Sequence, residues 1–100
     1  MKIRVTAKNY PQEVLRSETP VLVEFFAVWC GKCAMMEDVL DEIAKEYDGR
    51  VKVCQIESEE SAVLAAEFEV GIVPAFVVFT RWKTGDYQWC TCRCFDQNVN

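Results

Sequence analysis

Residues 21–33 read VLVEFFAVWCGKC, and this stretch contains both a strand pattern and a cysteine motif. Residues 21–27 are apolar on both faces except at Glu24, which is the pattern of a strand buried between two layers. Cys30 and Cys33 follow at once, three residues apart, where helical spacing of apolar residues begins. The stretch therefore predicts a central strand that leads into two cysteines at the start of a helix.

The rest of the chain alternates strand and helix patterns around that segment. The helix that begins at the cysteines is expected to run to residue 47, with Gly49 placed to end it. Asn9 can cap a short helix before it, and Ser58 or Ser61 can cap a third helix after it. Strands are expected at residues 2–6, 51–56, 75–80 and 87–93.

This order of elements, β-α-β-α-β-α-β-β, predicts an α/β fold with three layers. Crossover connections place helices on both faces of a sheet. We expect the core of that sheet to be parallel and the closing hairpin to make it mixed. Sites in such sheets lie beyond the carboxyl ends of central strands, which is where Cys30 stands.

Composition narrows the possible classes of protein. The chain has 100 residues, 51% of them hydrophobic, and we expect a single domain over residues 1–100. Its net charge is −5 and it has no Lys/Arg cluster, which argues against nucleic acid and anionic membrane as partners. Residues 70–79 form the longest apolar stretch, too short for a membrane span. The N-terminal residues lack the apolar block of a secretory signal, so a cytoplasmic location is expected.

Cys30 and Cys33 suit thiol–disulfide chemistry. A thiolate is the nucleophile in disulfide exchange, and a helix N-terminus stabilises negative charge through unpaired N–H groups. The alternative is a metal-binding module, because C-x-x-C also occurs in zinc sites. That site would need further ligands, which the chain without histidine would draw from carboxylates or from Cys54, Cys90, Cys92 and Cys94.

Glu24 interrupts an apolar strand, which singles it out. A buried carboxyl group resists ionisation, so its pKa should rise and suit it to proton transfer near neutral pH. The alternative is an exposed glutamate on a half-solvated strand.

Residues 21–33 resemble the active-site segment of the thioredoxin family. The resemblance continues through a helix at residues 35–47, a strand at residues 51–56 and the stretch GIVPAFVVF at residues 71–79. It implies a thioredoxin-like three-layer fold, with residues 1–80 family-like and residues 81–100 a divergent strand and tail. The usual C-terminal helix is not expected there, because residues 95–100 are short and polar.

The resemblance also implies roles for individual residues. Cys30 would be the exposed attacking thiol and Cys33 the buried resolving thiol. The family usually has aspartate at the position of Glu24 and uses it, through water, to deprotonate the buried cysteine. A cis bond is implied between Val73 and Pro74, although Pro74 by itself could simply begin an edge strand. The substrate-binding residues would be Trp29, Gly31, Lys32, Ile72, Val73 and Pro74.

The implied function is a protein-disulfide reductase, an electron carrier in cell redox homeostasis with a redox-active Cys30–Cys33 disulfide. No bound cofactor or metal is expected. Electrons would come from a separate flavoprotein reductase, and the substrates would be disulfide-containing proteins. An oxidase or isomerase of the same fold and the metal-binding module stay open as alternatives.

The C-terminal part raises two further expectations. A missing terminal helix would leave one sheet face partly bare, so we expect the tail or a second copy in a homodimer to cover it. Cys90, Cys92 and Cys94 alternate and would share one face of a strand. They could form a buried apolar stripe, an auxiliary redox site or a soft-metal site with Cys30 and Cys33. Cys54 is expected to be a buried, inert thiol.

Overall fold

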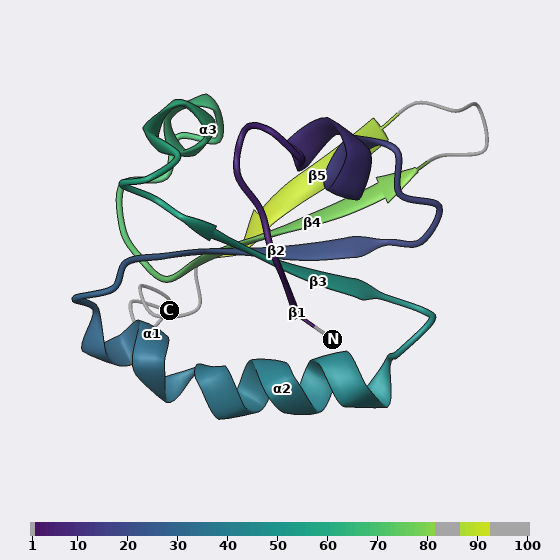
Figure 1. The fold of residues 1–100 in the computed structure, drawn as a ribbon, viewed down its shortest axis with the longest axis horizontal. Coiled ribbons are helices and arrows are strands. Elements are labelled where there is room, and N and C mark those ends of the chain that lie inside the picture. Colours follow the sequence, from purple (N-terminus) through teal and green to yellow (C-terminus); the bar gives the residue numbers. More distant parts are fainter. Residues whose placement is uncertain (1, 82–86, 93–100) are drawn as a thin grey trace.

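A computed structural model of the chain describes residues 2–81 and 87–92, with the side chains of residues 2–80. Within these residues, nine elements follow one another (Figure 1). In order they are β1 (Lys2–Arg4), the π-helical turn η1 (Pro11–Leu15), β2 (Val21–Phe26), α1 (Gly31–Met35), α2 (Glu37–Glu46), β3 (Lys52–Glu57), α3 (Ala62–Glu67), β4 (Ala75–Arg81) and β5 (Tyr87–Cys92).

The five strands form one sheet in the order β1-β3-β2-β4-β5, which places β2 at its centre. Figure 1 shows α1 and α2 on one face of this sheet and η1 and α3 on the other. The predicted three-layer fold with a mixed sheet is therefore confirmed. The expected central strand at residues 21–27 corresponds to β2.

The two faces of β2 meet different surroundings because side chains alternate along a strand. Val21, Val23 and Phe25 belong to the large buried cluster on the η1 and α3 face. Leu22 packs instead against the smaller cluster that includes Leu40 of α2. The apolar run in the sequence thus reflects burial on both sides, and Glu24 lies on the α2 face between Leu22 and Phe26.

The sheet becomes mixed at β4 rather than only at the closing hairpin. β1 and β2 are parallel to β3, but β4 is antiparallel to β2 and β5 is antiparallel to β4. A crossover to a parallel strand must travel the length of a strand, about 20 Å for six residues. The six residues of α3 rise only about 9 Å, whereas α1 and α2 together rise about 22 Å. The chain therefore re-enters the sheet near the end of β3.

The helix expected from the cysteines to residue 47 is divided at Met36, which ends α1 and precedes α2. The N–H of Met36 is shared between the carbonyls of Lys32 and Cys33, at 3.2 and 3.1 Å, which tightens this turn. Gly49 lies after α2 with φ 84°, a conformation that glycine adopts without steric cost. Its predicted role at the end of the helix is confirmed.

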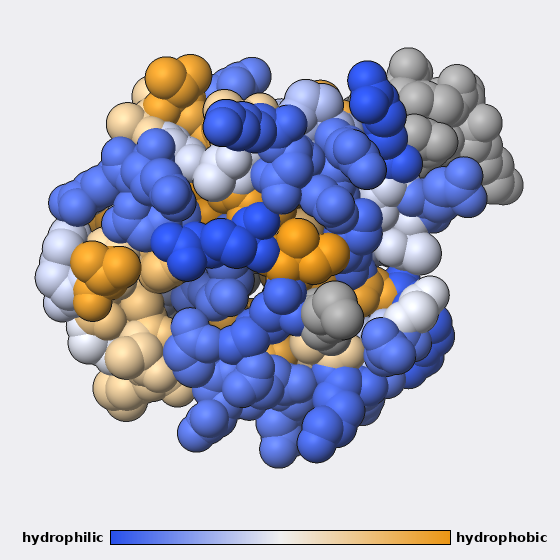
Figure 2. Space-filling view, in the orientation of Figure 1, coloured by the Kyte–Doolittle hydropathy of each residue, from blue (hydrophilic) through white to orange (hydrophobic). Residues whose placement is uncertain are grey.

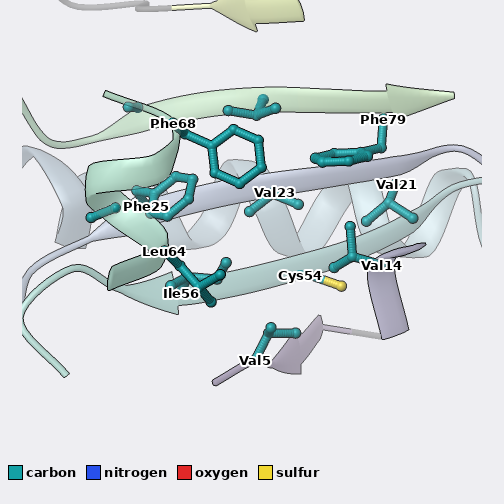
Figure 3. Packing of buried hydrophobic residues seen from close by; sticks show 13 residues of the cluster. Val5, Val14, Val21, Val23, Phe25, Cys54, Ile56, Leu64, Phe68 and Phe79 are labelled. Atoms are coloured by element: carbon teal, nitrogen blue, oxygen red, sulfur yellow. The ribbon is translucent and has the colours of Figure 1, made fainter. Parts of the chain in front are cut away.

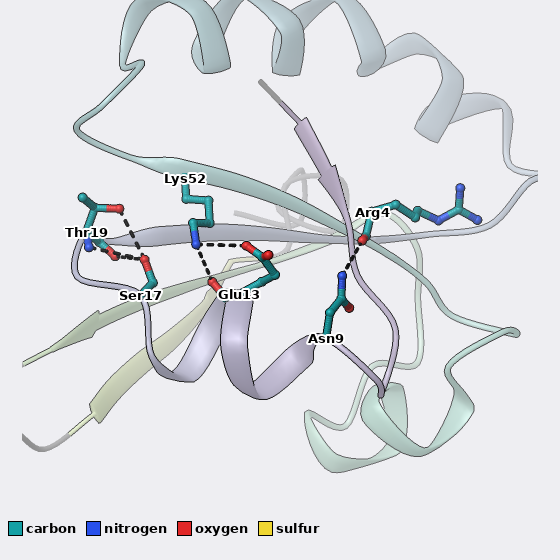
Figure 4. A network of polar contacts seen from close by, with 6 residues as sticks. All are labelled: Arg4, Asn9, Glu13, Ser17, Thr19 and Lys52. Atoms are coloured by element: carbon teal, nitrogen blue, oxygen red, sulfur yellow. Dashed lines mark hydrogen bonds and ion pairs between the residues drawn. The ribbon is translucent and has the colours of Figure 1, made fainter.

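The predicted side-chain caps differ from the structure. Asn9 does not cap η1, because its Oδ1 accepts a hydrogen bond from the Thr6 N–H at 2.8 Å and its Nδ2 donates to the Arg4 carbonyl at 3.1 Å (Figure 4). Asn9 therefore stabilises the turn after β1 through these two hydrogen bonds. Ser61 stands at the N-cap position of α3, but its hydroxyl has no partner among the described residues. The predicted side-chain cap at Ser61 is therefore absent from α3.

Polar contacts attach η1 to the sheet. Lys52 Nζ of β3 donates to the Glu13 carbonyl at 3.0 Å and pairs with its Oε1 at 3.1 Å (Figure 4). After η1, Ser17 Oγ donates to the Thr19 carbonyl at 2.8 Å. These contacts fix the approach of the chain to β2.

Aromatic rings fill the layer between the sheet and α3 (Figure 3). Phe68 lies 5.7 Å from Phe25 and 5.5 Å from Phe79, measured between ring centroids. Tyr10 lies 6.4 Å from both Phe68 and Phe79 with its ring edge-on. Such tilted arrangements suit the charge distribution of aromatic rings.

Several expectations concern parts that the structure leaves undescribed. The C-terminal helix, the tail and the side chain of Cys94 fall in residues 93–100, which lie outside the described residues. The same holds for the side chains of Cys90 and Cys92, whose backbones pair with Val78 and Phe76. No helix within the described ranges has both the length and the apolar character needed to cross a bilayer.

Replacing Phe25 with alanine should lower the free energy of unfolding by about 3–5 kcal/mol, because its ring is fully buried and contacts Phe68. Urea denaturation measures this change. The exposed Val63→Ala on α3 is the control and should change stability by less than about 0.5 kcal/mol. Equal effects of the two substitutions would contradict this account of the core.

Candidate active site

The turn from β2 into α1 places Cys30 and Cys33 together. Cys30 is the N-cap residue of α1, with φ −90° and ψ 114°, and its N–H donates to the Ala27 carbonyl at 3.1 Å. The Cys33 N–H donates a hydrogen bond to Cys30 Sγ at 3.1 Å. The sulfur of Cys30 therefore occupies the capping position that an oxygen of serine or aspartate takes in other helices.

Both thiols are free, and they differ in access to solvent. Cys30 is 9% exposed and Cys33 is 3% exposed. The resemblance implied an exposed Cys30, but both cysteines are buried, and Cys30 is only the less buried of the two residues. The cause is packing, because both cysteines form a small cluster with Ala27, against which Phe26 and Val73 lie.

Cys33 holds its proton strongly. Burial raises the pKa of its thiol to about 12, and the contact with Cys30 and the negative charge of Glu24 act in the same direction. Cys33 is therefore protonated at neutral pH in this state and needs a base before it can act as a nucleophile.

The loop before β4 covers Cys30. The Val73–Pro74 peptide bond is cis, as the resemblance implied. Cys30 Sγ lies 3.8 Å from the Val73 carbonyl oxygen, to which it can donate. Pro74 is buried, whereas Gly71 and Ile72 are exposed. The direction of β4 explains this contact, because an antiparallel β4 begins beside the carboxyl end of β2.

Apolar side chains stand exposed around the cysteines. Trp29 is 67% exposed and Ile72 is 54% exposed. Trp29 directly precedes Cys30 in the chain, and Ile72 precedes Val73, whose carbonyl contacts Cys30 Sγ. Val28 and Met35 are exposed as well. Figure 2 shows apolar side chains gathered at the α1 end of the molecule. The remaining predicted substrate-binding residues, Gly31 and Lys32, are exposed in the first turn of α1.

Trp29 is held by a polar contact that the sequence did not indicate. Its Nε1 donates to Glu59 Oε2 at 3.0 Å, across 30 positions of the chain. Glu59 follows β3, and strand order alone does not reveal how near its side chain comes to the turn after β2.

Glu24 is buried, as its place in an apolar strand predicted. It is 1% exposed, and burial raises the pKa of its carboxyl group. Oε1 accepts a hydrogen bond from Gln55 Nε2 at 2.9 Å, while Oε2 has no partner among the described residues. Sequence reasoning missed Gln55, although the parallel register that pairs it with Glu24 would have indicated it.

Cys54, the remaining cysteine whose side chain is described, lies on the opposite face of the sheet in the large cluster. It is fully buried, and burial raises the pKa of its thiol to about 12. The expectation of a buried thiol is confirmed. Within residues 2–80, no group of three or more cysteine, aspartate or glutamate side chains is arranged to hold a metal ion.

Glu24→Gln should stabilise the folded protein at neutral pH. Because the pKa of Glu24 is raised on folding, the folded state holds this proton more tightly than the unfolded chain does. The contribution of Glu24 to stability is therefore present at low pH and is lost as pH rises from the ordinary carboxyl range through the raised value. Urea denaturation over a pH series should show a gain for Glu24→Gln that vanishes in acid. The exposed Glu18→Gln is the control, and a similar pH-dependent gain there would contradict the assignment.

Comparisons with known proteins agree with this site. The Thioredoxin family model matches residues 1–94. Thioredoxin 1 of a Nostoc species is 41% identical over 76 residues, which cover 76% of this chain and 71% of that protein. Thioredoxin M5, chloroplastic, of Oryza sativa subsp. japonica is 44% identical over 72 residues, covering 72% of this chain and 42% of that protein.

Solved structures give the same result for the fold. Chloroplastic thioredoxin z superposes with a TM-score of 0.76 at 26% identity and covers 90% of this chain and 80% of its own. The Trx4 domain of ERdj5 reaches a TM-score of 0.86 at 17% identity, covering 98% of this chain and 87% of its own, and supports the fold alone. Two cysteines lie in contact at the start of α1, and the Thioredoxin family model matches most of the chain. The chain therefore belongs to the thioredoxin family and is a protein-disulfide oxidoreductase.

Proposed function

We propose that the chain reduces disulfides of other proteins with Cys30 as the attacking thiol and Cys33 as the resolving thiol. The hydrogen bond from the Cys33 N–H to Cys30 Sγ at 3.1 Å carries this assignment. A backbone N–H at the first turn of a helix stabilises negative charge on the sulfur it contacts. Cys30 is also the less buried of the two residues.

The reaction proceeds in two exchanges. The Cys30 thiolate attacks one sulfur of the substrate disulfide, which forms a mixed disulfide and releases the first substrate sulfur as a thiolate. Cys33 then loses its proton and attacks Cys30 Sγ. The bond between Cys30 and the substrate breaks, the second substrate sulfur leaves, and the Cys30–Cys33 disulfide forms. Two electrons pass from the protein to the substrate, whose sulfurs take up two protons.

Glu24 serves as the proton acceptor for Cys33. Both side chains are buried, and the negative charge of Glu24 raises the pKa of the Cys33 thiol. A carboxyl group with a raised pKa is a stronger base than an exposed one and can take a proton near neutral pH. Transfer through a bridging water, as in the family, would accommodate the longer side chain of glutamate.

Substrate proteins bind on the surface around Cys30. Trp29 and Ile72 offer apolar contact to a flexible segment beside the disulfide. The exposed backbone of Gly31 and Lys32 and the loop at Val73 and Pro74 border the same sulfur. Because Pro74 has no N–H, the groups left for pairing with substrate backbone are those of its neighbours.

The chain works without a bound cofactor, as one domain, and a separate reductase restores its dithiol. We propose a flavoprotein for that reductase, as the family resemblance implies. A reducing compartment such as the cytoplasm suits this role, because free thiols persist there. In such a compartment the protein is an electron carrier between the reductase and its substrates.

A second copy of the chain is the proposed cover for the sheet face on the α2 side of β4 and β5. The support is on β2 and β4, where Leu22 and Val78 stand opposite each other on that face and are both only half-buried. Burying an apolar sheet face between two copies would remove it from water.

Cys30→Ser should reduce catalysed reduction of insulin disulfides to the uncatalysed rate, because no thiolate remains to attack. Cys33→Ser should also stop turnover, but it should trap a mixed disulfide with substrate that mass spectrometry detects. Cys54→Ser is the matched control and should retain turnover, because Cys54 is buried on the other face. Dithiothreitol and NADPH with a flavoprotein reductase serve as separate electron sources. Full activity of Cys30→Ser with either source would refute the proposed function.

Because a second copy is proposed to cover the sheet face, sedimentation equilibrium should give the mass of a dimer. The mass should fall toward that of the 11.5 kDa chain on dilution. A monomer at every concentration would show that the face is covered in another way.

A further inference from the structure

A row of polar side chains connects Glu24 with the surface on the α2 face of the sheet. Gln55 of β3 stands opposite Glu24 of β2 in the parallel register. Its Nε2 donates to Glu24 Oε1 at 2.9 Å and to Glu37 Oε2 of α2 at 3.2 Å. One amide group thus contacts two carboxylates, one buried and one at the surface.

Beyond Glu37 the row ends in a lysine. Lys2 Nζ of β1 forms an ion pair with Glu37 Oε1, and it lies 2.8 Å from Asp41 Oδ1. Lys2, Glu37 and Asp41, here named the surface cluster, therefore come from the edge strand and from α2. The Gln55 amide joins this cluster to the carboxyl group of Glu24, because it is hydrogen-bonded to both Glu37 and Glu24.

The chemistry of an amide restricts what Gln55 can do. Its nitrogen carries two hydrogens and accepts none, so Gln55 gives one N–H to each carboxylate and does not pass protons between them. It favours the ionised form of Glu24, because a hydrogen bond to a charged acceptor is stronger than one to a neutral acceptor.

We propose that Gln55 is a positioning residue that couples the charges of the surface cluster to Glu24 and thereby sets the pH at which Cys33 can be deprotonated. This role rests on the proposed function of Glu24 as proton acceptor. A leucine of similar size would fill the same half-buried space, so the N–H groups are the part of Gln55 that the coupling needs.

The charged and titratable groups around Glu24 act with opposite signs. Burial opposes ionisation of Glu24, and the negative charge of Glu37 raises its pKa further. The Gln55 hydrogen bond and the positive charge of Lys2 lower that pKa. Asp41 acts through Lys2, and Cys33 is the group that donates the proton. Each substitution in the row therefore has a predicted direction.

The test isolates the step in which Cys33 attacks. A mixed disulfide between Cys30 and the chromophore 5-thio-2-nitrobenzoate is formed by rapid mixing, and stopped-flow absorbance follows its release as Cys33 displaces it. The rate is measured from mildly acidic to mildly alkaline pH. Since Glu24 must be ionised to accept the proton, the midpoint of the acidic limb follows its pKa.

Gln55→Leu should move this midpoint upward by about one pH unit, equivalent to a roughly tenfold slower release on the acidic limb. Lys2→Met should also move it upward, and Glu37→Gln should move it downward. The latter two changes are at partly exposed side chains and leave the Gln55 residue itself unaltered. The opposite signs therefore distinguish coupling from a general loss of stability, including one caused by poor folding of Gln55→Leu.

Lys52→Met is the matched control. Lys52 is also a partly exposed lysine in an ion pair, with Glu13 Oε1 at 3.1 Å, but it lies toward η1 on the other face of β3. Lys52→Met changes the net charge by the same amount as Lys2→Met and should leave the midpoint of the acidic limb unchanged. An equal shift for both lysines would mean a general effect of net charge and would overturn the proposal.

Glu24→Gln separates this inference from the proposed function. If Glu24→Gln removes the acidic limb while Gln55→Leu, Lys2→Met and Glu37→Gln leave its midpoint in place, the coupling is refuted and Glu24 keeps its role. If Glu24→Gln leaves the limb unchanged, the proton-accepting role fails and the coupling fails with it. Slow chromophore release that is insensitive to Cys33→Ser would instead refute the resolving role of Cys33.

Discussion

The hydrogen bond from the Cys33 N–H to Cys30 Sγ depends on where β2 ends. β2 is the central strand, and its apolar side chains are buried on both faces, so its position in the sheet is fixed by packing. The chain leaves β2 at Phe26 and turns into α1 at Gly31. A sulfur at that turn meets N–H groups that have no partner within the helix. The stability of the core thereby holds the reactive sulfur in place.

The direction of β4 brings the second part of the site to the first. α3 is too short to carry the chain back along the sheet, so β4 starts beside the end of β2 and runs antiparallel to it. Val73 and Pro74 then lie against Cys30, although more than 40 positions separate them in the chain. A parallel β4 would have begun beside the amino end of β2, away from Cys30. Strand direction is therefore a condition for the active site.

The buried carboxyl group of Glu24 needs hydrogen-bond donors, and the neighbouring strand supplies a donor to only one of its two oxygens among the described residues. An ionised carboxylate away from water is unfavourable unless donors or positive charges compensate. Gln55 supplies a donor to one oxygen, and the positive charge of Lys2 on the edge strand also favours the ionised carboxylate. The other oxygen has no partner among the described residues. A carboxyl group in this position retains its proton more readily than an exposed one, which is the property that proton exchange with Cys33 requires.

Local sequence patterns were enough to predict the layered α/β fold, the central strand and the two cysteines at a helix start, because periodicity and a short motif are local signals. Burial of Glu24 followed from the same pattern. Tertiary structure decided the direction of β4, the division of the helix at Met36 and the contacts of Gln55 and Glu59. Such contacts join residues far apart in the chain, and they depend on helix lengths and strand register that no local pattern specifies.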